Sequence, residues 1–92
     1  MKILHLNLHK KWFDLILAGK KKVEYREIKH YWTKRLFNDD GPQKKFDIIL
    51  FRNGYSKNAR EMKVEFKGVR VEKDRYVILL GKILEKKDCE RF

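Results

Sequence analysis

The sequence predicts an α+β fold, a small and strongly curved β-barrel of five strands with two short helices. Five segments show the apolar alternation or the continuous apolar run typical of strands. Two segments between the early strands show the apolar spacing of short amphipathic helices. The longest strand segment changes the parity of its apolar residues at Gly68, as a β-bulge does where a sheet bends. An open α+β sheet covered by helices is the alternative architecture.

The first strand is predicted over residues 3–8, where four of the six residues are Ile or Leu. A helix follows over residues 10–18, with Trp12 and Ile16 four residues apart on its apolar face. Gly19 comes directly after this helix, where a positive φ costs least. A helix of about ten residues is marginal alone, so packing against a sheet must hold it.

The second strand is predicted over residues 22–28, and the helix before it allows the first two strands to lie parallel or apart in a barrel. A second helix is predicted over residues 30–37, with Trp32 and Leu36 on one face. Residues 38–42 form a loop by composition.

The third strand, residues 46–51, is almost entirely apolar and is therefore expected in the centre of the sheet, covered on both faces. Asn53-Gly54 signals a turn after it. The last strand is predicted over residues 76–84. The charged residues 85–92 are expected to form a frayed tail.

The strand between them, residues 61–72, contains a one-residue slip. Its apolar side chains take one parity before Gly68 and the other parity after it: Met62, Val64 and Phe66, then Val69 and Val71. A glycine at such a slip predicts a β-bulge.

The chain has 92 residues, which predicts one domain over residues 1–92. It carries 24 Lys and Arg against 13 Asp and Glu, a formal charge of +11. The excess is concentrated in residues 1–36, with ten basic and three acidic side chains. A field of this sign favours polyanions, of which nucleic acid is the commonest. The alternative is that the lysines only solubilise a small domain.

Other partner classes have little support in the sequence. No apolar run approaches the ~20 residues that a membrane span needs. The three histidines are spread out, whereas zinc requires three or four converging ligands, so we expect no metal and no cofactor. Cys89 is the only cysteine, which excludes an intrachain disulfide and favours a reducing, cytoplasmic setting.

The stretch from Gly19 to Glu27 carries most of the predicted function. Strand alternation places Glu24 and Arg26 on one face. If Val23 and Tyr25 face the core, this acid and base line a cleft on the opposite face, with three lysines at its entrance: Lys20, Lys21 and Lys22. Arg26 would then bind a phosphate and Glu24 would accept a hydrogen bond from a base. The alternative is an ordinary surface ion pair beside lysines that complement the helix dipole.

Aromatic and basic side chains alternate in two later segments, a pattern that suits single-stranded or flipped bases. Trp32 and Tyr55 are the predicted stacking residues. The nucleic-acid-binding prediction therefore comprises, besides these two rings, Lys20, Lys22, Arg26, Lys29, Arg35, Arg52, Asn53 and Lys57. The alternative for Trp32 is that it packs the second helix.

The spacing Gly19-x-Lys21-x-x-Glu24-x-Arg26, after an amphipathic helix, resembles the signature of the ASCH domain family. ASCH domains belong to the PUA-like superfamily of RNA-associated β-barrels. The resemblance implies a barrel of five or six strands with a cleft lined by the signature strand. Family members include proposed RNA-binding regulators, ribonuclease-like proteins and a small amidohydrolase that acts on acetylated cytidine.

In that amidohydrolase a lysine and a threonine of the motif work with a later glutamate. Lys21 matches the lysine, Glu24 stands where the threonine would be, and Glu65 is only a loose stand-in for the later glutamate. We therefore favour a domain that binds RNA or a nucleotide-like ligand. The alternatives are a small hydrolase that uses Lys21 and Glu24 on an amide or a phosphodiester, and a basic module that binds an acidic protein. The sequence does not predict the oligomeric state.

Overall fold

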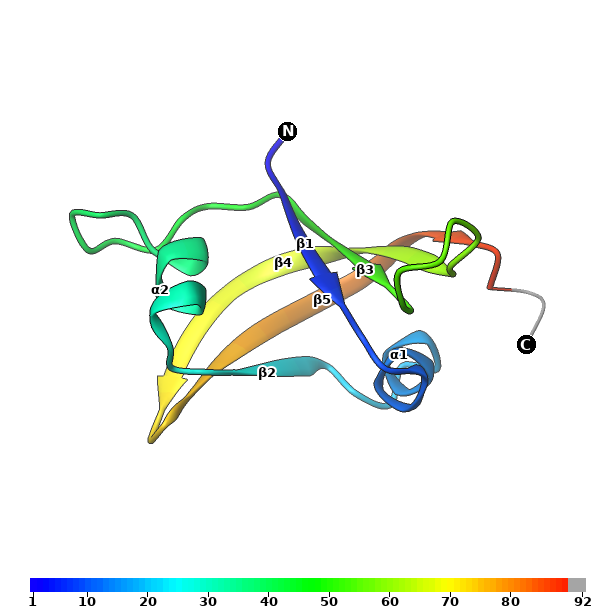
Figure 1. Ribbon diagram of the computed structural model, residues 1–92, viewed down its shortest axis with the longest axis horizontal. Coiled ribbons are helices and arrows are strands. Elements are labelled where there is room, and N and C mark those ends of the chain that lie inside the picture. Colours follow the sequence, from blue (N-terminus) through cyan, green and yellow to red (C-terminus); the bar gives the residue numbers. More distant parts are fainter. Residues whose placement is uncertain (90–92) are drawn as a thin grey trace.

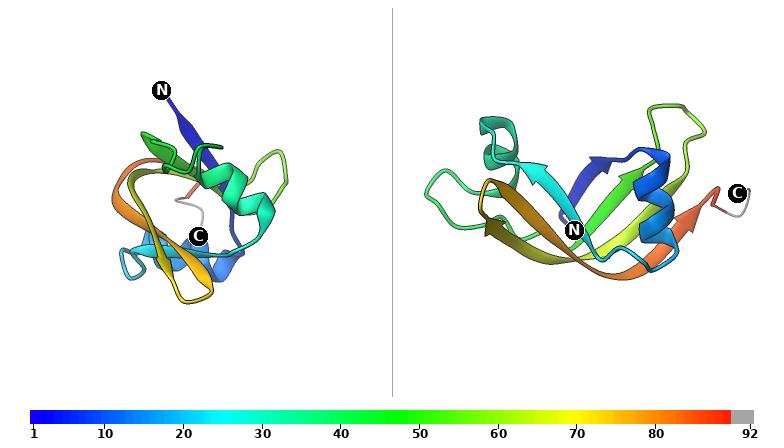
Figure 2. Two further views of the ribbon diagram at one scale, coloured as in Figure 1. Left: turned by 90° about the vertical axis from the view of Figure 1, so that its left-hand side faces the viewer. Right: turned by 90° about the horizontal axis from the view of Figure 1, so that it is seen from below.

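The fold is one five-stranded sheet that curls into a half-barrel, with the two helices at opposite ends of it (Figures 1 and 2). The structure is a computed structural model and describes residues 1–89. It confirms the predicted small, barrel-like α+β fold. The elements are β1 (Ile3–Asn7), α1 (Lys10–Leu17), β2 (Val23–Glu27), α2 (His30–Leu36), β3 (Ile48–Arg52), β4 (Glu61–Glu72) and β5 (Arg75–Lys87).

The order of strands in the sheet is β1-β3-β4-β5-β2. β1 pairs with β3 in parallel, and the other three pairs are antiparallel. α1 therefore carries the chain from one edge strand to the other, so the first two strands lie apart, one of the two arrangements that the sequence left open. β3 lies between β1 and β4, and Ile48, Ile49 and Phe51 are buried, as its apolar run predicted.

β4 and β5 form a long curved hairpin of 12 and 13 residues that makes the floor of the half-barrel (Figure 1). Their register shifts between Phe66 and Val69, and Gly68 between them has a φ of +115°. This confirms the predicted bulge. Two further shifts on either side of Val64 were not predicted. Val69 and Val71 share a parity, as predicted, and lie opposite Ile78 and Tyr76, but Val71 is near the hairpin turn and is 56% exposed.

The expectation of a frayed tail is wrong for residues 85–89. β5 continues to Lys87, which pairs with Glu61, and the Lys63 ammonium lies 3.1 Å from the Glu85 carboxylate across the ladder. Cys89 is buried, and its thiol donates to the backbone oxygen of Glu61. Cross-strand pairing thus orders a charged segment whose composition alone favours fraying. The remainder of the predicted tail, 90–92, lies outside the described residues.

The core fills the concave side of the sheet with side chains from β1, α1, β3, β4 and β5. From α1, Phe13 and Ile16 are buried, whereas Trp12 is 40% exposed. The prediction that Trp12 faces the core is therefore wrong, because the buried stripe is centred one residue further along the helix. Within residues 1–89, no helix is both long and apolar enough to span a membrane.

Candidate functional site

A cleft of about 860 Å³ opens where the two edge strands, β1 and β2, face each other across the mouth of the half-barrel. Its volume lies within the range of small-molecule and cofactor sites. Its polar and aromatic lining comes from both edge strands, both helices and the segment after β3: His5, Asn7, His9, Trp12, Lys21, Glu24, Tyr25, Arg26, Tyr31, Trp32, Arg35, Arg52 and Tyr55.

The inward face of β2 carries Glu24 and Arg26. Glu24 lies opposite Ile78 and Arg26 lies opposite Tyr76, and both β5 residues are buried in the core. Since directly opposite residues share a face of a sheet, Glu24 and Arg26 point into the half-barrel. The shared face was predicted, but the core assignment was wrong: Glu24 is 5% exposed and Tyr25 is 39% exposed.

The Glu24 carboxylate receives three donors in the cleft. It accepts a hydrogen bond from the Tyr25 backbone N–H at 3.1 Å and another from the Arg26 guanidinium. The Lys21 ammonium lies 3.5 Å from Glu24 Oε1. The side chains of Lys21 and Arg26 are themselves only 12% and 17% exposed. The three residues of the motif therefore converge, and the carboxylate charge is well compensated where water is scarce.

Two arginines bind the free edge of β1, Arg26 from β2 and Arg35 from α2. Arg26 Nη2 donates to the backbone oxygen of Asn7 at 3.1 Å, and Arg35 Nη2 donates to that of His5 at 3.0 Å. Both oxygens lie on the edge of β1 that does not pair with β3. Backbone groups of successive residues point to opposite sides of a strand, and the Leu8 N–H, next to Asn7, donates to the backbone oxygen of Arg52 on β3. The mouth of the half-barrel is thus tied by guanidinium groups at this edge, which satisfies backbone oxygens that a closed barrel would pair.

Four of the aromatic rings in the cleft already have cations beside them. The Lys21 ammonium lies 4.6 Å from the ring centre of Tyr25 and 5.3 Å from that of Trp12. The Arg35 guanidinium lies 5.6 Å from the ring of Trp32 and 5.7 Å from that of Tyr31. These are cation–π distances, so the rings also help to hold the charged groups in place.

Tyr55 differs from the other rings because it is 88% exposed. It lies on the loop after β3, which is attached to β1 by a reciprocal pair of hydrogen bonds. Asn7 Nδ2 donates to the Gly54 oxygen at 2.8 Å, and Asn7 Oδ1 accepts from the Gly54 N–H at 3.0 Å. Gly54 has a φ of +97°, a conformation that favours glycine at this turn. The anchored turn presents an exposed ring at the rim of the cleft.

Seven of the residues singled out in the sequence line this cleft: Lys21, Glu24, Arg26, Trp32, Arg35, Arg52 and Tyr55. Lys20, Lys22, Lys29, Asn53 and Lys57 are not among the lining residues. The side chain of Asn53 instead donates to the Leu8 oxygen and accepts from Arg60. Glu65 lies on β4, where its carboxylate accepts the backbone N–H of Lys82. The structure does not bring Glu65 to Lys21 and Glu24.

Several lining residues were not predicted, above all Asn7, Trp12 and Tyr25. The signal for Asn7 was slight, a polar residue at the end of an apolar strand. Trp12 was assigned to the core because it fits the helical apolar spacing. Within residues 1–89 no group of three or more His, Cys, Asp or Glu side chains is placed to hold a metal ion.

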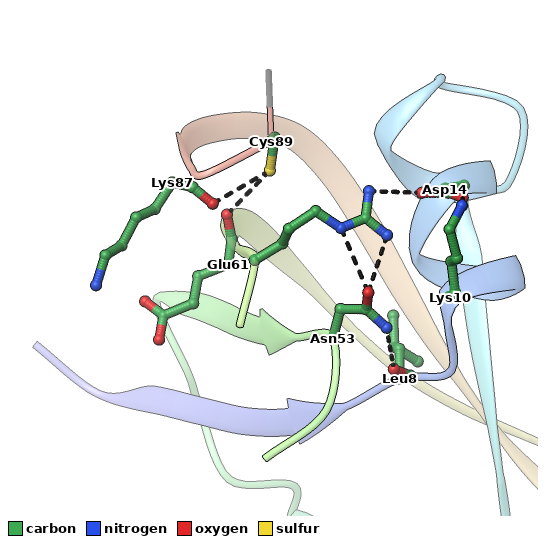
Figure 3. Close-up of polar contacts among 8 residues, drawn as sticks. Leu8, Lys10, Asp14, Asn53, Glu61, Lys87 and Cys89 are labelled. Atoms are coloured by element: carbon green, nitrogen blue, oxygen red, sulfur yellow. Dashed lines mark hydrogen bonds and ion pairs between the residues drawn. The ribbon is translucent and has the colours of Figure 1, made fainter. Parts of the chain in front are cut away.

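A second buried charge, that of Arg60, lies outside the cleft, and its surroundings are drawn in Figure 3. Arg60 is 2% exposed. Its guanidinium lies 2.7 Å from the Asp14 carboxylate, donates to Asn53 Oδ1 at 2.9 Å, and lies 4.5 Å from the ring centre of Phe13. Hydrogen bonds from Lys10 and then from Arg60 lower the pKa of Asp14 below its usual value. This cluster joins α1 to the loop before β4.

Comparison with known proteins identified one family. The model of the ASCH domain matches residues 6–77, which include every residue that lines the cleft except His5. Searches of curated proteins and of solved structures returned no match.

Proposed function

This chain belongs to the ASCH domain family, whose PUA-like domains are generally associated with RNA, and from that premise we propose that it binds RNA or a nucleotide-like ligand in the cleft between β1 and β2. One observation carries the proposal. A single cleft of about 860 Å³ combines five aromatic rings with four Lys and Arg side chains and one carboxylate, that of Glu24. Stacking surfaces beside cations are what unstacked nucleotides require.

The base is expected to stack on Tyr55. Its ring is the most exposed of those in the cleft, whereas Trp32 already lies beside the Arg26 and Arg35 guanidinium groups, 5.0 and 5.6 Å from their Cζ atoms. Trp32 then acts as a wall that holds these cations. Stacking of a base on an aromatic ring contributes ~1–3 kcal/mol.

Arg35 is the best placed partner for a phosphate. In residues 1–89 no carboxylate lies within ion-pair distance of its guanidinium, which contacts the neutral oxygens of His5 and Tyr31. Arg26 was the predicted phosphate ligand, but its guanidinium donates to Glu24, Tyr25 and Asn7. We therefore assign Arg26 to positioning Glu24 and the β1 edge, and phosphate binding to Arg35.

The test is binding of labelled single-stranded RNA followed by fluorescence anisotropy at several salt concentrations. Tyr55→Ala should weaken binding by about 5- to 100-fold, the loss of one stacked base. Lys57→Ala is the matched control, because Lys57 lies on the same loop and does not line the cleft. Absence of binding by the unmodified protein at low salt, or an equal loss in both variants, would contradict the proposal.

The pairing of Lys21 with Glu24 supports a second candidate, a hydrolase that acts on an amide of a modified nucleoside or on a phosphodiester. Hydrolysis would need a lone pair on Glu24 to activate water, yet three donors already approach this carboxylate. For this reason we rank binding first. Acetylated cytidine and short RNA would test for turnover, and Lys21→Ala should then lower kcat by about 10²–10⁴-fold if the pair is catalytic.

A further inference from the structure

A second, smaller groove of about 340 Å³ lies on the other side of Arg35. Its lining comes from the start of β1, from α2 and from the segment before β3: Lys2, Ile3, Leu4, Arg35, Lys44 and Phe46. Three of these six residues are cations. Lys2, Lys44 and Phe46 do not line the cleft and have no part in the proposed function.

The cations of this groove have no acidic partner among the described residues. Across residues 1–89 no carboxylate lies within ion-pair distance of the side chains of Lys2, Arg35 or Lys44. The carboxylate of Asp47, at the start of the same segment, accepts the backbone N–H of Lys2 at 2.7 Å and does not pair with its ammonium. The positive charge around this groove is therefore available to an anionic ligand.

The segment that carries Lys44 and Phe46 is anchored to the rest of the fold. The backbone N–H of Lys44 donates to the Leu36 oxygen at 2.9 Å, which ties this segment to the end of α2. The Phe46 ring packs edge-on against Phe66, with ring centres 5.3 Å apart. The side chains of Lys44 and Phe46 therefore start from anchored backbone, and less conformational entropy is lost when a ligand binds them.

The groove and the cleft share Arg35, which lines both cavities. Along β1, His5 lines the cleft and Lys2 lines the groove. Three residues of a strand span roughly 10 Å, so the groove begins one short step beyond the cleft. A chain that leaves the cleft beside Arg35 would meet Lys44 and Lys2 next.

We propose that this second groove is a phosphate subsite for a single-stranded RNA that extends out of the cleft past Arg35. The inference rests on the proposed function, because the cleft must hold a nucleotide of the same strand. It adds that the preferred ligand is an oligonucleotide, not a free nucleoside, and it gives the direction in which the strand leaves. Phosphates recur at every nucleotide, which suits successive cations better than a single small anion does.

An acidic segment of a protein is the competing occupant. RNA fits better because the groove shares Arg35 with a cleft lined by five aromatic rings, which would face bases in an RNA complex and have no counterpart in a run of acidic side chains. The same experiment separates the two, through competition by polyglutamate.

The experiment compares uridine monophosphate with labelled oligouridine, for the unmodified protein and for the double variant Lys2→Ala/Lys44→Ala. The control is Lys82→Ala/Lys86→Ala, which removes the same charge from exposed positions of β5 that line neither cavity. The double variant should bind the monophosphate as before. Its oligouridine affinity should fall, and the slope of log K against log salt should become shallower by about 1.4, the value for two phosphate contacts on a single strand. The oligouridine affinity of the control variant should fall less, and its slope of log K against log salt should change less.

Equal oligouridine affinity and salt slope in the double variant and the control would overturn the subsite and leave the proposed function intact. No binding of either ligand by the unmodified protein would overturn both. Displacement of oligouridine by polyglutamate of equal charge at equal concentration would replace RNA with an acidic protein as the occupant of the groove.

Discussion

Arg60 and Arg26 have the same kinds of neighbours, yet they lie in very different places. Each pairs with a carboxylate, bonds to an amide oxygen and lies near an aromatic ring: Asp14, Asn53 and Phe13 for Arg60, and Glu24, Asn7 and Trp32 for Arg26. The Arg60 cluster joins α1 to the start of β4, where Arg60 is 2% exposed; Figure 3 draws Asp14 and Asn53, its two polar partners. The Arg26 cluster lines a cleft of about 860 Å³.

This difference shows that a buried charge with good partners is not by itself a site. Arg60 is 2% exposed and fastens α1 to the sheet. Arg26 holds two edge strands apart at a fixed distance, because its guanidinium spans from Glu24 on β2 to the Asn7 oxygen on β1. The first arrangement closes a gap between elements, and the second ties two edge strands across an open cleft. Substitutions at the two clusters should therefore affect different properties.

The largest expected effect is on stability at Arg60. Arg60→Ala should lower the free energy of unfolding by about 2–5 kcal/mol, because it leaves a cavity beside Phe13 and removes the bonds that tie Asp14 and Asn53 to a buried guanidinium. Arg60→Met keeps most of the volume without the charge and should lose less, since no large cavity forms and Asp14 keeps its Lys10 partner and its contact with solvent. Urea unfolding followed by circular dichroism measures both. Equal stability of Arg60→Ala and the unmodified protein would show that the cluster does not hold α1.

A smaller stability effect and a larger binding effect are expected at Arg26. Arg26→Met removes charge-assisted hydrogen bonds to Glu24 and Asn7, but Glu24 keeps the Tyr25 N–H and the Lys21 ammonium, so the loss should be about 1–2 kcal/mol. RNA affinity should nevertheless fall, because the edge of β1 and the Glu24 carboxylate lose their common support. Arg60→Met is the matched variant and should keep its RNA affinity at a temperature where both proteins are folded. A reversed order of affinities would remove the distinction between the two clusters.

The two clusters also mark what could be predicted from the sequence. Lys21, Glu24 and Arg26 are neighbours in the chain, so strand alternation was enough to place Glu24 and Arg26 on one face. Which face is buried depended on the partner strand: Ile78 and Tyr76 of β5 turn Glu24 and Arg26 inward, and no local pattern in β2 carries that information. Asn7, Trp12 and Arg35 line the same cleft as the residues of β2 only because the sheet curls.

The fold was easier to predict from the sequence than the site. Apolar periodicity located all five strands and both helices, and the parity slip located the bulge at Gly68. The end of β5 was missed because its charged residues are ordered by pairing with β4, a long-range effect. Arg60 was missed for a similar reason. In the sequence it ends a polar, basic loop, and only the packing of α1 against that loop surrounds it.

The smallest expected effect is on the acid stability of the Arg60 cluster. Hydrogen bonds from Lys10 and Arg60 lower the pKa of Asp14 in the folded protein below the value near 3.8 of an unperturbed aspartate. Asp14 therefore binds its proton less readily when folded than when unfolded. Its contribution to stability is complete above the unfolded pKa and is lost as the pH falls through the lower folded pKa.

Asp14→Asn should remove that contribution. The urea midpoints of the unmodified protein and of Asp14→Asn should differ by a constant amount above about pH 5, and the difference should shrink as the pH falls below about 4. Asp40→Asn makes the same charge change in the loop before β3, away from Arg60, and provides the control. Because the Asp14 side chain is 39% exposed, solvent screens the interaction and the shift in midpoint should be modest and weaker in high salt. A difference between the midpoints that stays constant down to acid pH would mean that the Asp14 carboxylate does not stabilise Arg60 through its charge, and that the cluster holds α1 by packing against Phe13.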